Sequence, residues 1–263
     1  TPVTRAPALF IGHGSPTNAI EQNAYTRALN LVGLQIEKNT SAVLCISAHW
    51  LTAGTWVTST AHPKMIYDFY GFPKPLYEVQ YPAPGNEALA KTIHAALADH
   101  VDIKPDNGNW GLDHGSWAVL KHLFPKATIP VLQLSIDMSE PPEFHLKLGV
   151  QLRKLRDQGV LILGSGNIVH NLRQLDRQPS AVPKPWAIQF DQWVAEKIDS
   201  SDHLALANAF LKADGGVLSV PTLDHYLPLL YVLGARHKDE PAQTIFEQIE
   251  YGSLSMRSVL FNG

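Results

Sequence analysis

Four histidines occupy similar places in the sequence, each beside an apolar stretch. They occur in the segments FIGHGSP (His13), CISAHW (His49), ILGSGNIVHN (His170) and LDHYLPLLY (His225). Neutral imidazole binds zinc, iron and copper well. The glycines beside His13 and before His170 permit sharp turns and close backbone approach. A single histidine in such a setting is more often packed or solvated, but four in matching positions predict a shared metal site.

A fifth histidine, His114, lies in the segment WGLDHGSW and differs from the other four. It does not follow a predicted strand but precedes a helix that we expect to begin near Ser116. Asp113 either caps that helix or holds an imidazole in one tautomer. The segment is therefore interpreted either as part of a site or as a structural turn, and both interpretations stay open.

Other candidates for chemistry carry weaker signals. Of the remaining seven histidines, only His62 lies where it could approach a substrate, in a proline-rich loop. Cys45 lies inside an apolar run, which favours a buried small hydrophobe over a nucleophile. Ser165, in GSGN, lacks the G-x-S-x-G spacing of a nucleophile elbow. Ser15, in GHGSP, lacks the lysine and the spacing of a phosphate-binding loop.

The elements that must position these histidines follow from the alternation of short apolar runs with helical patterns. This alternation predicts an α/β fold with a largely parallel sheet. The runs VLCIS and VLILG lack polar alternation, as expected of strands covered on both faces. In such sheets ligands gather beyond the carboxyl ends of the strands, so histidines far apart in sequence can converge there. We predict strands at Ala8-Ile11, Ala42-Ser47, Trp56-Thr60, Val131-Ser135, Val160-Leu163 and Gly216-Val220, and helices at Asn23-Leu31, Asn86-Ala98, Ser116-Leu123, Pro141-Arg156, Pro185-Lys197 and His225-Leu233.

Length and composition limit the classes of protein. The 263 residues suit one large α/β domain or two small ones, and 45% hydrophobic residues can build a real core. The net charge of -3 shows no basic excess for nucleic acid or an anionic membrane. The one cysteine excludes an internal disulfide and fits a reducing cytosol. Without a membrane-length apolar run or a signal-peptide pattern, we expect a cytoplasmic protein.

Two proline-rich loops interrupt the pattern, at Ala61-Pro84 and Arg177-Pro185. A loop as long as the first is uncommon in a compact domain unless it is functional. Its aromatic side chains either pack over a flat ring or anchor the loop to the body of the protein, and the sequence leaves both open. They are Tyr67, Phe69, Tyr70, Phe72, Tyr77 and Tyr81.

Several segments together resemble a known family. The sequence is similar to the 4,5-DOPA dioxygenase extradiol family, within the class III extradiol ring-cleavage dioxygenases of the protocatechuate 4,5-dioxygenase beta-subunit type. The matching segments run from Pro7 to Met256 and so cover nearly the whole chain. They are PALFIGHGSP, SAHW, YDFYGFP, YPAPG, WGLDHGSW, PVLQLSID, SGNIVHNL, DHYLPLLYVLGA and GSLSM.

The resemblance implies a three-layer α/β/α fold with a mostly parallel or mixed central sheet, a single catalytic domain over residues 1–263 and one divalent metal. It implies His13, His49 and His225 as metal ligands and His170 as a further ligand or an acid/base. His114 is similar to the family's active-site histidine near the substrate. Better-known class III enzymes use two histidines and one carboxylate, whereas here the third ligand is His225. The nearest carboxylate, Asp224, is alternatively a helix cap.

The implied activity is the opening of a catechol-type ring by O2. Fe(II) is expected for activity, and Zn(II) can occupy the same nitrogens without redox chemistry. The expected partners are a small aromatic diol and O2, with Phe69, Asn167 and Tyr226 contacting the substrate, and no nucleic acid or membrane. The alternatives are a zinc-dependent hydrolase, a tetrapyrrole chelatase-like enzyme, because of the opening GHGS, and a non-catalytic binding module. The sequence does not specify the oligomeric state.

Overall fold

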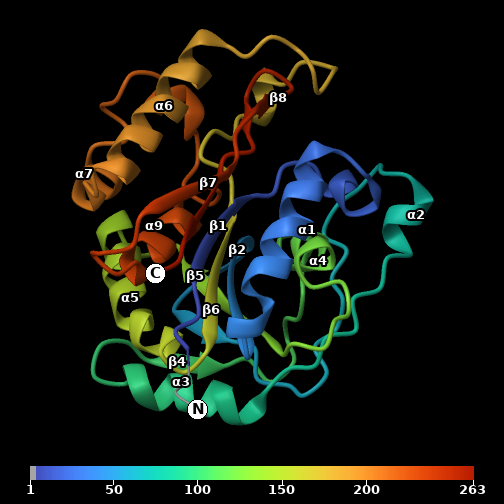
Figure 1. Cartoon of the computed structure of the whole chain (residues 1–263), viewed down its shortest axis with the longest axis vertical. Helices are drawn as coiled ribbons and strands as arrows, with labels where there is room; N and C mark the ends of the chain where they lie inside the picture. Colours follow the sequence, from blue (N-terminus) through green and yellow to red (C-terminus); the bar gives the residue numbers. More distant parts are fainter. Residues whose placement is uncertain (1–3) are drawn as a thin grey trace.

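A mixed sheet of eight strands forms the centre of the computed structural model, which describes residues 4–263 (Figure 1). The strand order is β4-β3-β5-β2-β6-β1-β10-β7. The inner strands β5, β2, β6 and β1 pair in parallel, whereas β10 pairs antiparallel with β1 and β7. The strands are β1 (Ala8–Gly12), β2 (Ala42–Thr52), β3 (Thr55–Val57), β4 (Ile103–Pro105), β5 (Val131–Asp137), β6 (Val160–Gly166), β7 (Ala242–Phe246) and β10 (Ser258–Phe261). A separate small sheet pairs β8 (Ile249–Glu250) with β9 (Leu254–Ser255).

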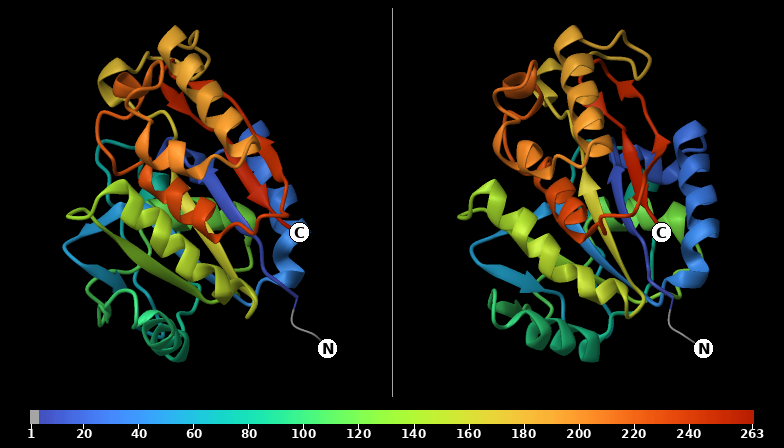
Figure 2. Two further views of the ribbon diagram at one scale, coloured as in Figure 1. Left: turned by 90° about the vertical axis from the view of Figure 1, so that its left-hand side faces the viewer. Right: turned by 60° about the vertical axis from the view of Figure 1, so that its left-hand side comes forward.

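Side chains of the inner strands alternate between two hydrophobic cores. In β1, Leu9 and Ile11 face the core beneath α1 (Ala24–Ile36) and α4 (His114–Leu123), whereas Ala8 and Phe10 face the core beneath α5 (Pro142–Arg156) and α9 (Leu227–Ala235). Figure 1 shows α1 and α4 on one side of the sheet and α5 and α9 on the other, and the turned views in Figure 2 show the sheet between these groups. The three-layer α/β/α arrangement is therefore confirmed.

The predicted helices lie close to where the capping residues place them. Asn23 accepts a hydrogen bond from the Thr26 backbone N–H at the start of α1, and Asn86 caps α3 (Glu87–Leu97) in the same way. Asp113 caps α4, which begins two residues earlier than predicted. The other helices are α2 (Lys74–Tyr77), α6 (Pro185–Asp199), α7 (His203–Asn208) and α8 (Gly216–Ser219).

Two strand predictions need correction. The segment Gly216-Val220, predicted as a strand, forms the single helical turn α8, in which the Ser219 backbone N–H bonds to Gly215 O. A short apolar run has no periodicity that separates a strand from a buried helical turn. The predicted strand Trp56-Thr60 is shortened to β3. The antiparallel strands β7, at the edge of the sheet, and β10, between β1 and β7, were not predicted.

The end of β2 also differs from the prediction. The predicted strand ended at Ser47, but β2 continues to Thr52 and therefore contains His49. The pairing of β2 with β5 shifts register between Ile46 and Leu51, and the pairing with β6 ends at Ser47. His49 thus lies in an irregular stretch beyond the regular ladder, where a side chain can be redirected. Among the described residues, no helix has the length and apolar character needed to span a bilayer.

Candidate metal centre

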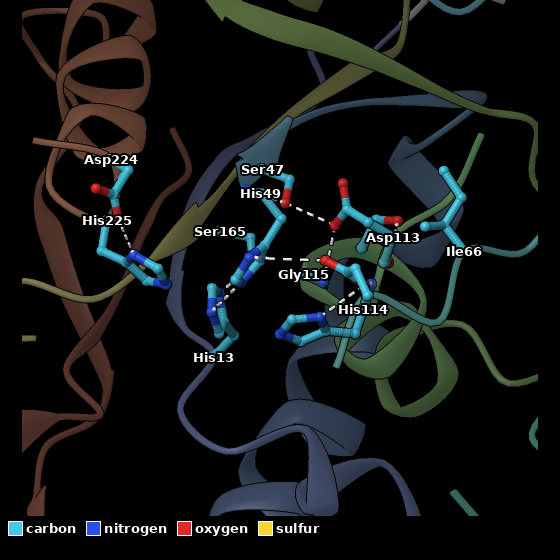
Figure 3. A network of polar contacts seen from close by, with 12 residues as sticks. His13, Ser47, His49, Ile66, Asp113, His114, Gly115, Ser165, Asp224 and His225 are labelled. Carbon is cyan, nitrogen blue, oxygen red and sulfur yellow. Dashed lines mark hydrogen bonds and ion pairs between the residues drawn. The ribbon is translucent and has the colours of Figure 1, made fainter. Parts of the chain in front are cut away.

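The five histidines singled out from the sequence line one pocket of about 390 Å³. They come from five separate segments of the chain, and Figure 3 shows His13, His49, His114 and His225 directed toward a common space. The other lining residues are mainly apolar. They are Gly14, Ser15, Pro16, Phe72, Leu172, Leu175, Tyr251 and Leu254.

The ends of β1 and β6 position three of these histidines. His13 directly follows β1, and its backbone N–H bonds to Gly166 O, at the end of β6, over 2.9 Å. The segment carrying His225 packs against the same strand end, where the Asn167 N–H bonds to His225 O over 2.8 Å. A Cβ atom at Gly166 would lie 2.2 Å from His225 O, so only glycine permits this approach. His170 is held by its backbone N–H, which bonds to Ser219 O.

The rings of His13, His49 and His225 are nearly equidistant. Their centroids are 5.1 Å apart for His13 and His49, 5.2 Å for His13 and His225, and 5.0 Å for His49 and His225. The Nε2 atoms of His13 and His49 lie 3.2 Å apart. Two nitrogens bound to one tetrahedral ion at about 2.0–2.1 Å would lie about 3.4 Å apart. The spacing of these two donors therefore fits a shared metal ion.

Distances between the possible ligand atoms group the histidines differently from the distances between ring centroids. His13, His49 and His114 each offer one ligand atom, and these atoms all lie within 4.8 Å of one another. His170, Asp224 and His225 form a second group by the same measure. The ring of His170 also stacks on that of His225, with centroids 3.5 Å apart and planes 7° from parallel. The pocket thus holds more imidazoles than one tetrahedral ion needs, and the excess is available for substrate or proton transfer.

Polar side chains behind the pocket orient three of the imidazoles. His13 Nδ1 lies 2.9 Å from Ser165 Oγ, and His225 Nδ1 donates to Asp224 Oδ2. His114 Nδ1 donates to Asp68 Oδ1 over 2.8 Å, and the same oxygen accepts the His114 backbone N–H. Such partners fix the ring orientation and leave Nε2 toward the pocket. Figure 3 shows Ser165 beside His13 and Asp224 beside His225.

Sequence reasoning treated these three partners unevenly. Ser165 was considered only as a nucleophile, and Asp224 was left between ligand and helix cap. The structure places both as hydrogen-bond partners of imidazoles. Asp68 was missed altogether. Its signal was available as the one acidic residue within the aromatic segment YDFYGFP of a long loop.

Burial keeps imidazoles of the pocket neutral. Burial, reinforced by the neighbouring histidines, holds the pKa of His13 and His49 well below the usual value of 6.5. Burial and the nearby His225 lower the pKa of His170 to about 3. Neutral imidazole is the form that binds a metal ion or accepts a proton. At neutral pH these three side chains are therefore ready for either role.

The residues predicted to contact substrate lie in different places. Phe69 packs against His114, with ring centroids 5.6 Å apart, but Phe72 and not Phe69 lines the pocket. Asn167 is 1% exposed, and its side-chain amide donates to Ser255 O. Tyr226 is also 1% exposed, and its hydroxyl donates to Leu206 O within the hydrophobic core beneath α5 and α9. The structure therefore does not place Asn167 or Tyr226 in the lining of the pocket.

The aromatic loop Ala61-Pro84 is mainly anchored to the body of the protein. Tyr81 is buried and its hydroxyl donates to Phe124 O, while the hydroxyl of Tyr77 donates to Phe69 O. Tyr70 is 94% exposed. His62 is exposed and does not line the histidine pocket. Of the loop's aromatic residues, Phe72 reaches the pocket wall.

Known proteins resemble this chain over almost its whole length. Residues 7–248 match the family model described as the catalytic LigB subunit of aromatic ring-opening dioxygenase. The chain is 47% identical over 259 residues to the 4,5-DOPA dioxygenase extradiol of Escherichia coli, covering 97% of this chain and 94% of that protein. It is 34% identical over 256 residues to the protein of the same name from Beta vulgaris, covering 96% and 95% of the two chains.

A solved structure agrees with these sequence matches. The crystal structure of an uncharacterized protein from Escherichia coli K12 superposes with a TM-score of 0.86 at 42% identity, covering 98% of this chain and 100% of that one. The predicted resemblance, the fold class and the dioxygenase activity class are confirmed, in preference to the hydrolase and chelatase alternatives. This chain belongs to the family of the catalytic LigB subunit of aromatic ring-opening dioxygenases.

Proposed function

We propose that this protein opens the ring of a catechol with O2, at a bond outside the pair of hydroxyl-bearing carbons, using one ferrous ion held by His13, His49 and His225. The observation that carries the proposal is the convergence of five histidines on one pocket, two of which have Nε2 atoms 3.2 Å apart. These donors are nitrogen atoms of intermediate softness, which suit ferrous iron and zinc alike.

Ferrous iron, when bound, would supply the one-electron chemistry that O2 requires and the Lewis acidity that favours catechol deprotonation. Zinc on the same nitrogens would supply only the second of these. The choice of iron in the proposal therefore rests on the reaction class and not on the donor set.

The remaining histidines are proposed to handle substrate and protons. His114 donates through Nδ1 to Asp68, so its Nε2 carries a lone pair toward the pocket and can accept a proton from a catechol hydroxyl. The ring of His170 lies parallel to that of His225, beside the proposed metal position. His170 is proposed to take up the proton of the second catechol hydroxyl as a base and to return it to the product as general acid.

The proposed substrate is a catechol with a substituent on the ring. Relatives from Escherichia coli and Beta vulgaris carry the name 4,5-DOPA dioxygenase extradiol, which makes DOPA the first substrate to test. The apolar wall formed by Phe72, Leu172 and Leu254 would bury the faces of a flat ring.

The test is anaerobic reconstitution of the metal-free protein with ferrous ion, followed by O2 uptake and product mass with catechol and DOPA. We expect one O2 consumed per ring opened, with both atoms of ¹⁸O2 retained in the first product before exchange. Protein loaded with zinc serves as the matched control and should be inactive. Equal activity of the zinc-loaded protein, or product formation without O2, would reject a dioxygenase mechanism.

A further inference from the structure

One buried residue, Asn167, joins three segments that form the wall of the histidine pocket. It directly follows β6 and is 1% exposed. Its backbone N–H donates to His225 O over 2.8 Å. Its side-chain oxygen accepts from the Gly14 N–H over 3.4 Å, and its side-chain nitrogen donates to Ser255 O over 2.7 Å. Three segments that are far apart in sequence therefore meet at this one residue.

Two of these segments carry proposed metal ligands. The acceptor for the Asn167 backbone is the carbonyl group of His225 itself, and Gly14 directly follows His13 in the chain. Figure 3 shows the rings of His13 and His225 directed toward the same space from separate segments. Because Asn167 bonds to the backbone at one ligand and beside the other, it bears directly on the 5.2 Å that separates their ring centroids.

The third segment, β9, is a fixed anchor for the Asn167 side chain. The hydroxyl of Ser255 donates to Asp191 Oδ1 over 2.6 Å, and Asp191 forms an ion pair with Arg257 over 2.8 Å. The Asn167 amide is therefore held from the side of β9. With its nitrogen bound there, its oxygen is the atom left to accept from the Gly14 N–H.

The segments approach one another backbone to backbone at this junction. A Cβ atom at Gly12 would lie 2.9 Å from Ser255 O, and one at Gly14 would lie 2.5 Å from Met256 Sδ. Gly14 also has a φ of 63°, a conformation that favours glycine. Asparagine suits such a junction because one short planar group carries both a donor and an acceptor, whereas an ionised aspartate offers only acceptors and alanine neither.

We infer that Asn167 is a positioning residue for the metal centre, which holds the His13 and His225 segments at the spacing that one ion requires. The inference rests on the proposed function, because that function assigns the ion to these histidines. Asn167 does not line the pocket, so it acts through the backbone of the two segments and not by contact with the ion or the substrate. A functional site needs its groups held to within about 0.5 Å, which buried hydrogen bonds to the supporting backbone provide.

The first test measures zinc affinity by competition with a chromogenic chelator. Asn167→Ala removes both side-chain bonds and keeps the backbone N–H. We expect the folded variant to bind zinc about ten- to a hundredfold more weakly than the parent protein, as is typical when a residue that orients metal ligands is removed. Zinc affinity equal to that of the parent would overturn the inference.

Asn30→Ala is the matched control for this test. It also removes a bond from an asparagine amide to a backbone carbonyl, that of His122, and Asn30 does not line the histidine pocket. Its zinc affinity should equal that of the parent protein. A loss as large as that of Asn167→Ala would mean that any such bond affects the ion, and it would overturn a specific role for Asn167.

Cobalt(II) gives a readout that a loss of stability alone does not move. Its visible absorption depends on the number and arrangement of the bound nitrogens, so it reports the geometry of the site in folded protein. At saturating cobalt, Asn167→Ala should show shifted bands, whereas Asn30→Ala should show the bands of the parent. An unchanged spectrum together with a lower midpoint of urea unfolding would assign Asn167 a purely structural role and overturn the inference.

A milder variant serves if Asn167→Ala does not fold. The short hydroxyl of Asn167→Ser can replace one of the two side-chain bonds at most, so zinc affinity should still fall and the cobalt bands should still shift, both by less than for alanine. Parent-like affinity and a parent-like cobalt spectrum in this variant would reject the inference.

Failure of this inference and failure of the proposed function are distinguishable. If the ferrous parent protein opens catechol while the Asn167 variants bind zinc and cobalt as the parent does, only the inference fails. If the parent protein binds these metals but opens no catechol, the proposed function fails, and the zinc and cobalt measurements still decide the role of Asn167.

Discussion

Two buried polar regions of this protein differ in how completely their hydrogen-bonding groups are paired. The first lies away from the pocket, where Arg156 is 0% and Glu240 1% exposed. The guanidinium group uses all five of its N–H donors, two of them on the two oxygens of Glu240. The other three reach the carbonyl oxygens of Ala6, Ala235 and Phe261. This network ties the ends of the chain to α5 and leaves nothing for a ligand.

The histidine cluster is the opposite case. His13, His114 and His225 each use Nδ1 on a partner within the protein. The Nε2 atoms of His114 and His225 face the pocket and have no hydrogen-bond partner among the described residues. The Nε2 atom of His13 contacts only the Nε2 atom of His49. A buried network in which every polar group is paired stabilises the fold. A network in which only one side of each imidazole is paired leaves the other nitrogen available to bind a ligand. The contrast separates structural from functional polar residues without reference to any relative.

The largest expected effect is loss of the metal ion from the half-paired cluster. His225→Ala should lose bound zinc or iron, because removing a donor takes away much of an interaction worth on the order of 10 kcal/mol. His114→Ala is the matched control and should keep the metal while losing turnover. Metal content after gel filtration, measured by mass spectrometry, decides between them. If His114→Ala loses the metal and His225→Ala retains it, the ion is held by the group of His13, His49 and His114.

The next effect concerns the fully paired network. Arg156→Met should lower the free energy of unfolding by about 3–5 kcal/mol, because it leaves the Glu240 carboxylate buried without its partner. Adding Glu240→Met should recover most of that loss. Lys147→Met, which breaks the exposed pair with Glu143, should change stability by less than about 1 kcal/mol. Urea unfolding measures all three, and a single Arg156 variant as stable as the Lys147 control would refute a structural role for the network.

The smallest effect tests a histidine that is paired on both sides. His145 is fully buried, Nδ1 accepts from the Tyr231 hydroxyl over 2.7 Å, and Nε2 donates to Glu140 O. Burial lowers its pKa to about 4. The unfolded chain, with a histidine pKa of about 6.5, therefore binds more protons than the folded protein between these values, so stability falls as the pH falls through this window.

This histidine alone should account for about 2 kcal/mol of the stability lost between pH 7 and pH 4.5. His145→Gln, compared with the parent protein by urea unfolding at both values, should show a loss smaller by that amount. The same loss in both proteins would mean that His145 does not titrate in this range. His94→Gln is a suitable second control, because His94 lies on α3 away from both networks.

Much of the fold followed from local patterns. The runs VLCIS and VLILG became β2 and β6 because strands covered on both faces must be apolar throughout. The helices began near their capping residues because unpaired N–H groups at a helix start need an acceptor. The helical turn at Gly216 and the antiparallel strands β7 and β10 did not follow, because short segments take the structure that their neighbours impose.

For the site, the sequence by itself determined the donor types and their placement after or within apolar strands. It could not determine which side chains stand behind the imidazoles, because Asp68 is 46 residues from His114 and Ser165 is 152 residues from His13. It also placed Asn167 and Tyr226 in the pocket, where the structure has them in the packed interior. Residue type and periodicity are local properties of the chain. Pairing, burial and the convergence of five histidines on one pocket depend on how distant segments pack, and the tertiary structure alone decided them.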